Sequence, residues 1–273
     1  VWTAPDTIKD ANGVDVTVDR LFMRRFNADN TPQSAVLPVS FTTAVKGGQR
    51  FGTVACDEDG DYVVTWTQYD TVNGQMQADI FARRFTAGGV ALGNHFRVNT
   101  YTLSDQKWSM VDVNAHGDFI ITWSSLGQED GAQMGTGYGV YARRFDSYGQ
   151  PLGQEFLVNI TKEGDQKYSS VAIDDMGGFV VTWTSDQGGV GTDIVARQYW
   201  QDGSPQPSAL GVGYNFGEIM VNQVTSGNQN FPDVAMNAAG TSYIVTWAGP
   251  DGNNNGIFGR QFTREVAQNV DPR

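Results

Sequence analysis

Cysteine, histidine and positive charge are scarce in this sequence. Among 273 residues there is one cysteine, Cys56, and there are two histidines, His95 and His116. An internal disulfide framework, a cysteine-based zinc cluster and a histidine-rich metal site are therefore excluded, and any bound metal must take oxygen ligands. The formal net charge of -12 argues against a nucleic-acid or anionic-membrane partner, because phosphate binding requires clustered cations.

Long apolar runs and a helix-forming composition are also missing. No apolar run approaches the roughly 18 residues that span a bilayer, so membrane insertion is not expected. Charged residues make up only 18% of the chain, whereas glycine, with 33 residues, exceeds its usual share of ~7%. This composition indicates many tight turns rather than long solvated helices.

A repeat of about 60 residues is the main feature that is present. Each copy contains a short apolar segment with a tryptophan near its end, and the tryptophans are 57, 60 and 64 residues apart. These segments are VVTWT (63–67), IITWS (120–124), VVTWT (180–184) and IVTWA (244–248). Each is followed by an arginine-bearing segment, and an upstream copy of the latter also occurs. The arginine-bearing segments are RLFMRRF (20–26), DIFARRF (79–85), GVYARRF (139–145), DIVARQY (193–199) and GIFGRQF (256–262).

Each copy is predicted to form four short strands. The first precedes the tryptophan strand, and between the two an Asp or Asn stands three residues before a Gly, which is typical of a tight hairpin turn. The third strand carries the arginine and the fourth ends in Val-Asn. The tryptophan strand is apolar on both faces, as in a sheet that is covered on both sides. The sequence therefore predicts an all-β, five-bladed or near five-bladed β-propeller built from ~60-residue four-stranded repeats.

We expect one propeller domain over residues 1–273, with blades at 1–45 (partial), 46–100, 101–160, 161–223 and 224–273 (partial). Trp2 corresponds to Trp66, so the sequence contains five second and five third strands but only four first and four fourth strands. Unpaired strand edges are normally covered. We therefore expect either a segment of a longer polypeptide or a neighbouring chain that adds the missing strands.

One arginine recurs in every third strand, with side chains two places away that are mostly aromatic. The five are Arg24, Arg83, Arg143, Arg197 and Arg260. The pattern predicts a guanidinium stacked between blades that donates hydrogen bonds to carbonyl groups or to an acid. A repeated anion site is the alternative, and the negative net charge opposes it.

A rim of glutamine and aromatic residues is the candidate ligand-binding site. A Gln precedes each tryptophan by 17 or 18 residues, and an aromatic residue stands two places after that Gln. The pairs are Gln49 and Phe51, Gln106 and Trp108, Gln166 and Tyr168, and Gln229 and Phe231. Amide groups can pair with sugar hydroxyls, and aromatic faces suit the C–H faces of sugars. The alternative is that the amides cap loops and the rings pack between blades.

Calcium is the one cofactor that the sequence leaves open. Asp57, Asp59 and Asp61 lie in one acidic turn, and hard cations prefer clustered carboxylate oxygens. The spacing departs from the EF-hand pattern and the other copies lack it, so an ordinary hairpin turn is the alternative and calcium is not expected to be needed for folding. Isolated acidic ligands also occur in the loops that follow the tryptophan strands. They are Asp70, Asp130, Asp186 and Asp251.

The phrases FxVN, QxxxxVA, GGFVVTW and ARRFxxxG recur in this order. This pattern resembles the repeats of large secreted and surface-attached bacterial proteins known as adhesin-like or as haemolysin-type calcium-binding proteins. The resemblance covers nearly the whole chain and carries no catalytic signature. It implies an extracellular or cell-surface location and a structural or adhesive role.

The expected function is therefore that of a non-enzymatic repeat module with a structural, adhesive or assembly role. Its expected partners are other copies of itself, other domains of a longer parent chain, and surface glycans. The alternative is a carbohydrate-binding, lectin-like propeller with the sugar on the glutamine-aromatic rim. A glycoside hydrolase is less favoured, because its carboxylates would have to be Asp112 and Asp233, which stand at non-equivalent positions.

Overall fold

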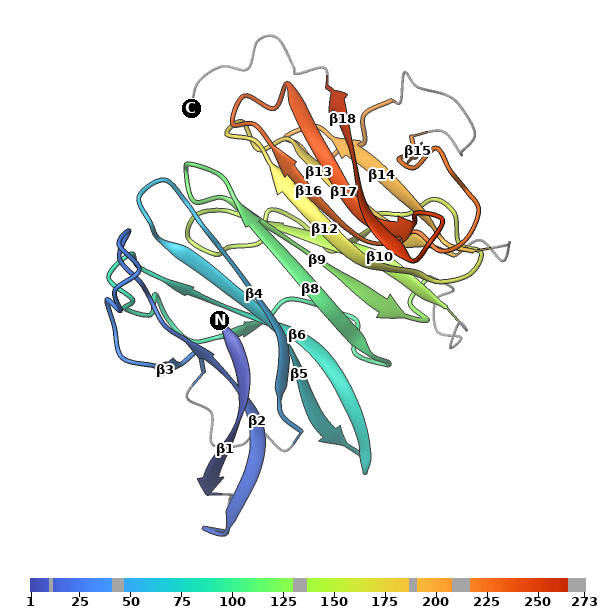
Figure 1. Cartoon of the computed structure of the whole chain (residues 1–273). Helices are drawn as coiled ribbons and strands as arrows, with labels where there is room; N and C mark the ends of the chain where they lie inside the picture. Colours follow the sequence, from blue (N-terminus) through green and yellow to red (C-terminus); the bar gives the residue numbers. More distant parts are fainter. Residues whose placement is uncertain (10–11, 41–46, 130–136, 187–190, 208–216, 265–273) are drawn as a thin grey trace.

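The computed structural model describes residues 1–9, 12–40, 47–129, 137–186, 191–207 and 217–264. Figure 1 shows these residues as a row of small twisted sheets. Every regular element among them is a β-strand, so the predicted all-β class is confirmed for this part of the chain. These residues contain no helix of the length and apolarity that crossing a lipid bilayer would require.

The strands form five separate antiparallel sheets that follow one another along the chain. The first sheet contains β1 (Trp2–Lys9), β2 (Asp15–Met23) and β3 (Leu37–Pro38). The second contains β4 (Gln49–Cys56), β5 (Tyr62–Val72), β6 (Gln75–Phe85) and β7 (Phe96–Arg97). The third contains β8 (Gln106–Val113), β9 (Phe119–Leu126), β10 (Tyr138–Phe145) and β11 (Phe156–Leu157). The fourth contains β12 (Gln166–Ile173), β13 (Phe179–Ser185), β14 (Asp193–Tyr199) and β15 (Ile219–Met220), and the fifth contains β16 (Asn230–Met236), β17 (Ser242–Pro250) and β18 (Asn255–Thr263).

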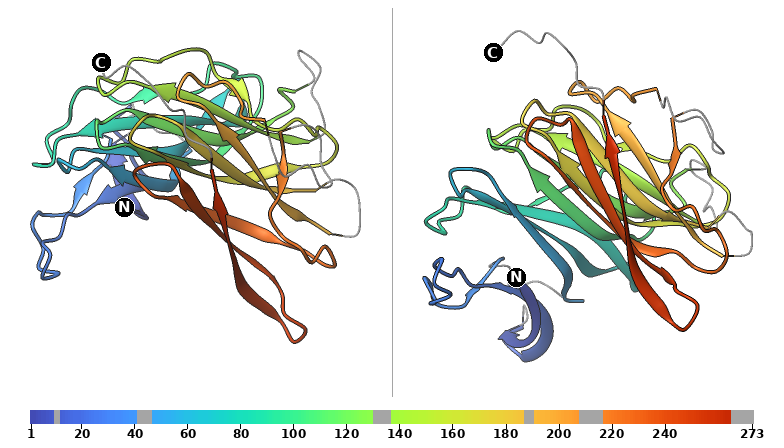
Figure 2. Two further views of the ribbon diagram at one scale, coloured as in Figure 1. Left: turned by 90° about the horizontal axis from the view of Figure 1, so that it is seen from above. Right: turned by 45° about the horizontal axis from the view of Figure 1, so that its top comes forward.

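Within each sheet the strands are hydrogen-bonded in sequence order, so each complete sheet is a simple meander. The first strands of neighbouring sheets contact one another, β4 with β8, β8 with β12, and β12 with β16. They form the inner line about which the sheets are arranged. Figure 1 and the right-hand view of Figure 2 place the first sheet, in blue, and the last sheet, in red, at the two ends of the row.

The two end sheets each have three strands, so the described residues do not make five complete blades. The first sheet aligns with the second, third and fourth strands of the repeat, because β1 pairs with β2 as β5 pairs with β6. The last sheet has the first three strands only. This inventory of four first, five second, five third and four fourth strands matches the strand count expected from the repeat.

Asp and Asn side chains close the hairpins between the first and second strands, as the sequence predicts. The Asn114 side-chain oxygen accepts hydrogen bonds from the backbone N–H groups of His116 and Asp118, both at 3.0 Å. The Gly117 N–H donates to the Asn114 carbonyl oxygen at 3.1 Å, and its φ of 82° is in the left-handed region that favours glycine. The turn residues thus satisfy their own backbone.

The tryptophans of the second strands occupy equivalent core positions. Trp66, Trp123 and Trp183 are fully buried, and Trp247 is 7% exposed. Each lies in a cluster that joins two consecutive sheets; Trp123, for example, packs with Ile80 and Val98 of the preceding sheet. All four tryptophans are therefore buried, in agreement with the strands that are apolar on both faces.

The recurring arginines join each sheet to the one before it. Arg143 donates from Nη1 to the Val98 carbonyl oxygen at 2.9 Å, and its guanidinium lies 5.6 Å from the centre of the Phe145 ring. The other carbonyl bonds between sheets run from Arg83 to Val39, from Arg197 to Val158 and from Arg260 to Val221. The predicted guanidinium between sheets, donating to carbonyl groups, is confirmed for these four residues. Arg24 in the first sheet donates instead to the Ser34 carbonyl oxygen of its own sheet.

Candidate functional site

The four predicted rim glutamines lie beneath the rim, in the core. Their side chains are at most 2% exposed. The amide oxygens of Gln106, Gln166 and Gln229 accept the indole N–H of Trp123, Trp183 and Trp247 at 3.0, 3.0 and 3.1 Å. Gln49 differs, because its amide nitrogen donates to Ser40 at 2.7 Å. The prediction that these glutamines line a ligand-binding rim is therefore corrected. A buried amide must find its hydrogen-bond partners inside the protein, and these amides find them there.

The four aromatic residues two places later have an unusual backbone. Their φ angles are all positive, between 54° and 58°, although none of them is glycine. The residues are Phe51, Trp108, Tyr168 and Phe231. In each sheet the pairing of the first two strands shifts register at this point, for example between Lys107 and Met110, so the aromatic residue lies in a β-bulge. Bulky residues at positive φ are conformational outliers, and bulges commonly redirect a side chain at a functional site.

A hydroxyl group from the preceding sheet holds this backbone in place. The Trp108 N–H donates to Thr67 Oγ1 at 3.2 Å, the Tyr168 N–H to Ser124 Oγ at 3.3 Å, and the Phe231 N–H to Thr184 Oγ1 at 3.2 Å. Each hydroxyl residue directly follows a core tryptophan in the sequence. The same short motif therefore positions one aromatic residue in the core and supports another at the surface.

The four rings form one continuous row across four sheets. Ring centres are 6.4 Å apart from Phe51 to Trp108, 4.7 Å from Trp108 to Tyr168, and 5.0 Å from Tyr168 to Phe231. The end members Phe51 and Phe231 are 48% and 63% exposed. The predicted aromatic rim thus exists as a connected surface, which we call the aromatic row.

Charged pairs border the aromatic row, and the sequence-based interpretation missed them. Arg50 pairs with Asp19 at 2.7 Å, Lys107 with Asp105 at 2.6 Å, and Lys167 with Asp165 at 2.8 Å. Each cation directly follows one of the buried glutamines, which is a signal that was present in the repeat. Because every cation already has a carboxylate partner, this surface is polar but has no excess positive charge, which suits an uncharged ligand rich in hydroxyl groups.

The two carboxylates considered for catalysis contact β12 from either side. Asp112 on β8 accepts the Ile173 N–H at 2.9 Å and the Val113 N–H at 3.0 Å. Asp233 on β16 accepts the Ser170 hydroxyl at 2.8 Å. Burial raises the pKa of the Asp112 carboxyl above its usual range, although the two backbone N–H groups oppose that shift. Ser170 and Ile173 are three residues apart on one strand, so these anchoring points are separated by ~10 Å along β12.

The acidic turn considered for calcium is a hairpin in which two carboxylates accept backbone N–H groups. Asp57 Oδ1 accepts the Asp61 N–H at 2.9 Å, and Asp61 Oδ1 accepts the Ala87 N–H at 2.8 Å. Among the described residues, no three His, Cys, Asp or Glu side chains are grouped so as to hold a metal ion, so Asp57, Asp59 and Asp61 do not form the cluster that was considered. Of the loop carboxylates, Asp251 accepts the N–H groups of Asn253 and Asn254. Asp130 lies outside the described residues.

Comparisons with known proteins identify no family from the sequence. No family model matches the chain, and no curated protein matches it. Among solved structures, a GH93 α-L-arabinofuranosidase of Fusarium graminearum in complex with arabinobiose is 12% identical and has a TM-score of 0.52; the alignment covers 90% of this chain and 67% of that one. An endo-arabinase of Bacteroides thetaiotaomicron is 14% identical over 97% of this chain and 95% of its own, with a TM-score of 0.47. A protein of unknown function from Dyadobacter fermentans is 12% identical over 96% and 95%, with a TM-score of 0.48.

The similarity to the arabinofuranosidase is one of fold, and it corrects the expected function. The sequence-based prediction was a non-enzymatic module with a structural, adhesive or assembly role. A glycoside hydrolase has the fold of this chain, so the exclusion of enzymatic activity is overturned together with the adhesive role. The repeat motifs predicted an architecture, and the arabinofuranosidase has a similar one.

Proposed function

We propose that the five sheets are blades of a β-propeller and that the chain is a carbohydrate-processing protein of the glycoside hydrolase type. The aromatic row is the observation that carries this proposal. Aromatic faces pack against the C–H faces of sugar rings, and hydroxyl and charged groups beside them satisfy the sugar hydroxyls. A row that crosses four sheets suits an extended oligosaccharide rather than a single sugar.

The backbone of the aromatic row supports a binding role. A residue at positive φ costs of order 1–3 kcal/mol when it is not glycine, and such conformations persist where the surroundings impose them. Here the same conformation occurs four times, each time with an aromatic side chain, and in three cases with a hydroxyl group of the preceding sheet on the N–H. The rings are thereby fixed before a ligand arrives, which lowers the entropy cost of binding.

Asp112 and Asp233 are the carboxylates that we propose for hydrolysis. A glycosidase needs one carboxyl group that remains protonated near neutral pH to protonate the leaving oxygen. Burial shifts the pKa of Asp112 upward, which is the direction that such an acid requires, and the exposed Asp233 fits the carboxylate that acts opposite it.

The test uses arabinan and arabino-oligosaccharides, the substrates suggested by the name of the arabinofuranosidase. Calorimetry should detect binding by the wild type that is lost in Trp108→Ala and Tyr168→Ala. Tyr148→Ala is the matched control, because Tyr148 is 79% exposed and lies in the turn after β10, outside the row. Release of reducing ends should disappear in Asp112→Asn and in Asp233→Asn while binding persists. Absence of binding would contradict the role of the row, and binding without any cleavage by the wild type would contradict hydrolysis.

A further inference from the structure

Among the described residues, no strand covers the outer edge of the last sheet, although a short strand covers the same edge in the other sheets. In the three complete sheets a short fourth strand pairs with the third: β7 with β6, β11 with β10, and β15 with β14. No described strand pairs with this side of β18. Ile257 of β18 is 80% exposed, whereas its counterparts Ile80, Val140 and Ile194 are fully buried.

The fourth strands are held by a Val-Asn pair that contacts one residue of the third strand from both sides. The Val158 N–H donates to the Val140 carbonyl oxygen at 2.8 Å, and Asn159 Oδ1 accepts the Val140 N–H at 2.8 Å. Val98 and Asn99 make the same two bonds to Ile80, and Val221 and Asn222 make them to Ile194. Ile257 is the counterpart of Ile80, Val140 and Ile194. Its N–H and carbonyl groups therefore point to the side of β18 on which no described strand lies.

A glutamate four residues before the Asn makes the second recurring contact. Glu218 accepts the N–H groups of Ile160 and Thr161 at 2.6 and 3.2 Å. Glu155 accepts those of Thr100 and Tyr101 in the same way. In both cases the two N–H groups directly follow the Asn of the preceding sheet. The corresponding residues for the last sheet are Gln223 and Val224, and no described side chain occupies the position of that glutamate.

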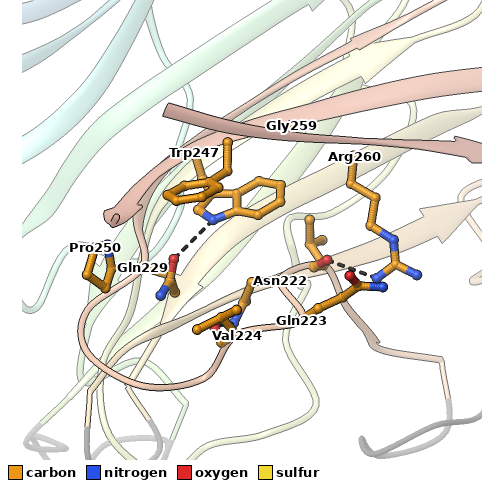
Figure 3. A pocket seen from close by; sticks show the side chains of 10 residues that line it. Asn222, Gln223, Val224, Gln229, Trp247, Pro250, Gly259 and Arg260 are labelled. Carbon is orange, nitrogen blue, oxygen red and sulfur yellow. Dashed lines mark hydrogen bonds between the residues drawn. The ribbon is translucent and has the colours of Figure 1, made fainter. Parts of the chain in front are cut away.

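A pocket lies at this place, as Figure 3 shows. It has a volume of about 240 Å³. Gln223 and Val224 line one part of it, while Trp247 and Phe258 supply apolar surface. In the second sheet the residue at the glutamate position is His95, and its ring packs 6.0 Å from Trp66 and 5.6 Å from Phe81, the counterparts of Trp247 and Phe258. The pocket is therefore the space that a fourth-strand side chain fills in an equivalent sheet.

We propose that this pocket and the edge of β18 form one binding site for an extended peptide strand with the sequence Glu-x-x-Val-Asn that comes from outside the described residues. The glutamate binds the N–H groups of Gln223 and Val224, and the Val-Asn pair binds Ile257 by β-addition. A second folded copy of this chain is not the occupant, because its own strands of this type, at 155–159 and 218–222, are already paired within their sheets. The proposal does not depend on the proposed function.

The probe is a labelled peptide with the sequence of residues 151–162, PLGQEFLVNITK, and the readout is fluorescence anisotropy with the full chain. We expect saturable binding that weakens roughly tenfold or more when the peptide carries Glu155→Ala or Asn159→Ala, because each change removes hydrogen bonds to backbone groups that stay desolvated. Hydrogen exchange at Ile257 should slow when the peptide binds.

Gly259 provides the matched pair of protein variants. Gly259→Pro removes the N–H that points toward the empty strand position, and proline is tolerated on an edge strand where that N–H faces solvent. Gly259→Ala keeps the N–H, and the added Cβ meets only ordinary contacts, with Thr246 Cγ2 at 3.6 Å as its nearest neighbour. Peptide binding should be lost in the first variant and kept in the second. No saturable binding at millimolar peptide, or equal binding to both variants, would overturn the proposal; so would a dimer of the wild type that Gly259→Pro dissociates, since the occupant would then be a second copy.

Discussion

The buried tryptophans and the aromatic row stand at equally regular positions of the repeat, yet they have opposite environments. Trp123 is fully buried in a sheet-to-sheet core, and its indole N–H is satisfied by Gln106. Trp108, two residues after that Gln, has a φ of 58° and is half-buried, and its ring contacts those of Phe51, Tyr138 and Tyr168. Regular recurrence therefore shows that a position has one environment in every copy, but it does not show whether that environment is core or surface.

The largest expected effect separates the two kinds of aromatic position by stability. Trp123→Ala should lower the free energy of unfolding by ~3–5 kcal/mol, the range for truncating a large buried aromatic residue. Phe231→Ala should cost only about 1 kcal/mol, because Phe231 is 63% exposed and its ring contact is with Tyr168. Urea denaturation measures both. Equal losses for the two variants would contradict the division into core and surface positions.

The next effect tests the hydrogen bond beneath the row. Gln106→Leu leaves the buried indole N–H of Trp123 without its acceptor, so we expect a loss of ~1–3 kcal/mol. The double variant with Gln106→Leu and Trp123→Phe should lose less stability than the sum of the losses of the two single variants, since the phenyl ring has no N–H to satisfy. Additive losses in this double-mutant cycle would show that the two side chains are not coupled.

The positive φ of the row residues predicts a smaller effect, in which a glycine variant is more stable than the alanine variant at the same position. Trp108→Gly should be more stable than Trp108→Ala by about 1 kcal/mol, because glycine adopts a φ of 58° without strain and alanine does not. Both variants lose the ring, so both should lose glycan binding. Thermal unfolding compares them, and a more stable alanine variant would mean that the left-handed backbone relaxes once the ring is gone.

The smallest expected effect is a pH dependence at Asp112. Burial raises the pKa of this carboxyl above 3.8, so the folded chain holds the proton more tightly than the unfolded chain does. Its stabilising contribution is complete below the unfolded pKa and is lost as the pH rises through the folded pKa. The melting temperature of wild type relative to Asp112→Asn should therefore fall as the pH rises from about 4 to about 7. A constant difference across this range would contradict the raised pKa.

Much of the fold was predictable because the repeat supplies its own internal comparison. The tryptophan strands, the Asx-Gly hairpins and the arginines between sheets each recur with constant spacing, and constant spacing in a meander means a constant neighbour. The first and last blades were predicted to be partial, and among the described residues the two end sheets have three strands each. Their missing positions could be counted from the sequence but not assigned an occupant.

Only part of the candidate site could be predicted from the sequence. The sequence singled out the aromatic residues that form the row, but it grouped the buried glutamines with them, because the period of a regular strand does not include the bulge between the two positions. One extra residue in the bulge turns the side chain of Trp108 away from the face that holds Gln106. The charged pairs were overlooked because this position of the repeat is Arg50 in one copy, Lys107 and Lys167 in two others and Asn230 in the fourth. The same residue type therefore does not recur in every copy.

The arginine bonds between sheets make the molecule a one-dimensional cooperative array. Each of Arg83, Arg143, Arg197 and Arg260 donates a hydrogen bond from its own sheet to a carbonyl group of the sheet before it. Within the part of the chain that the structure describes, the three middle sheets have two neighbouring sheets each and the two end sheets have one, and we expect the free energy of opening a sheet to follow this number. Backbone amides should accordingly exchange with solvent from both ends inward, and the surface that the aromatic row offers should be most rigid at Trp108 and Tyr168, in the two sheets that have neighbours on both sides and lie at the centre of the row.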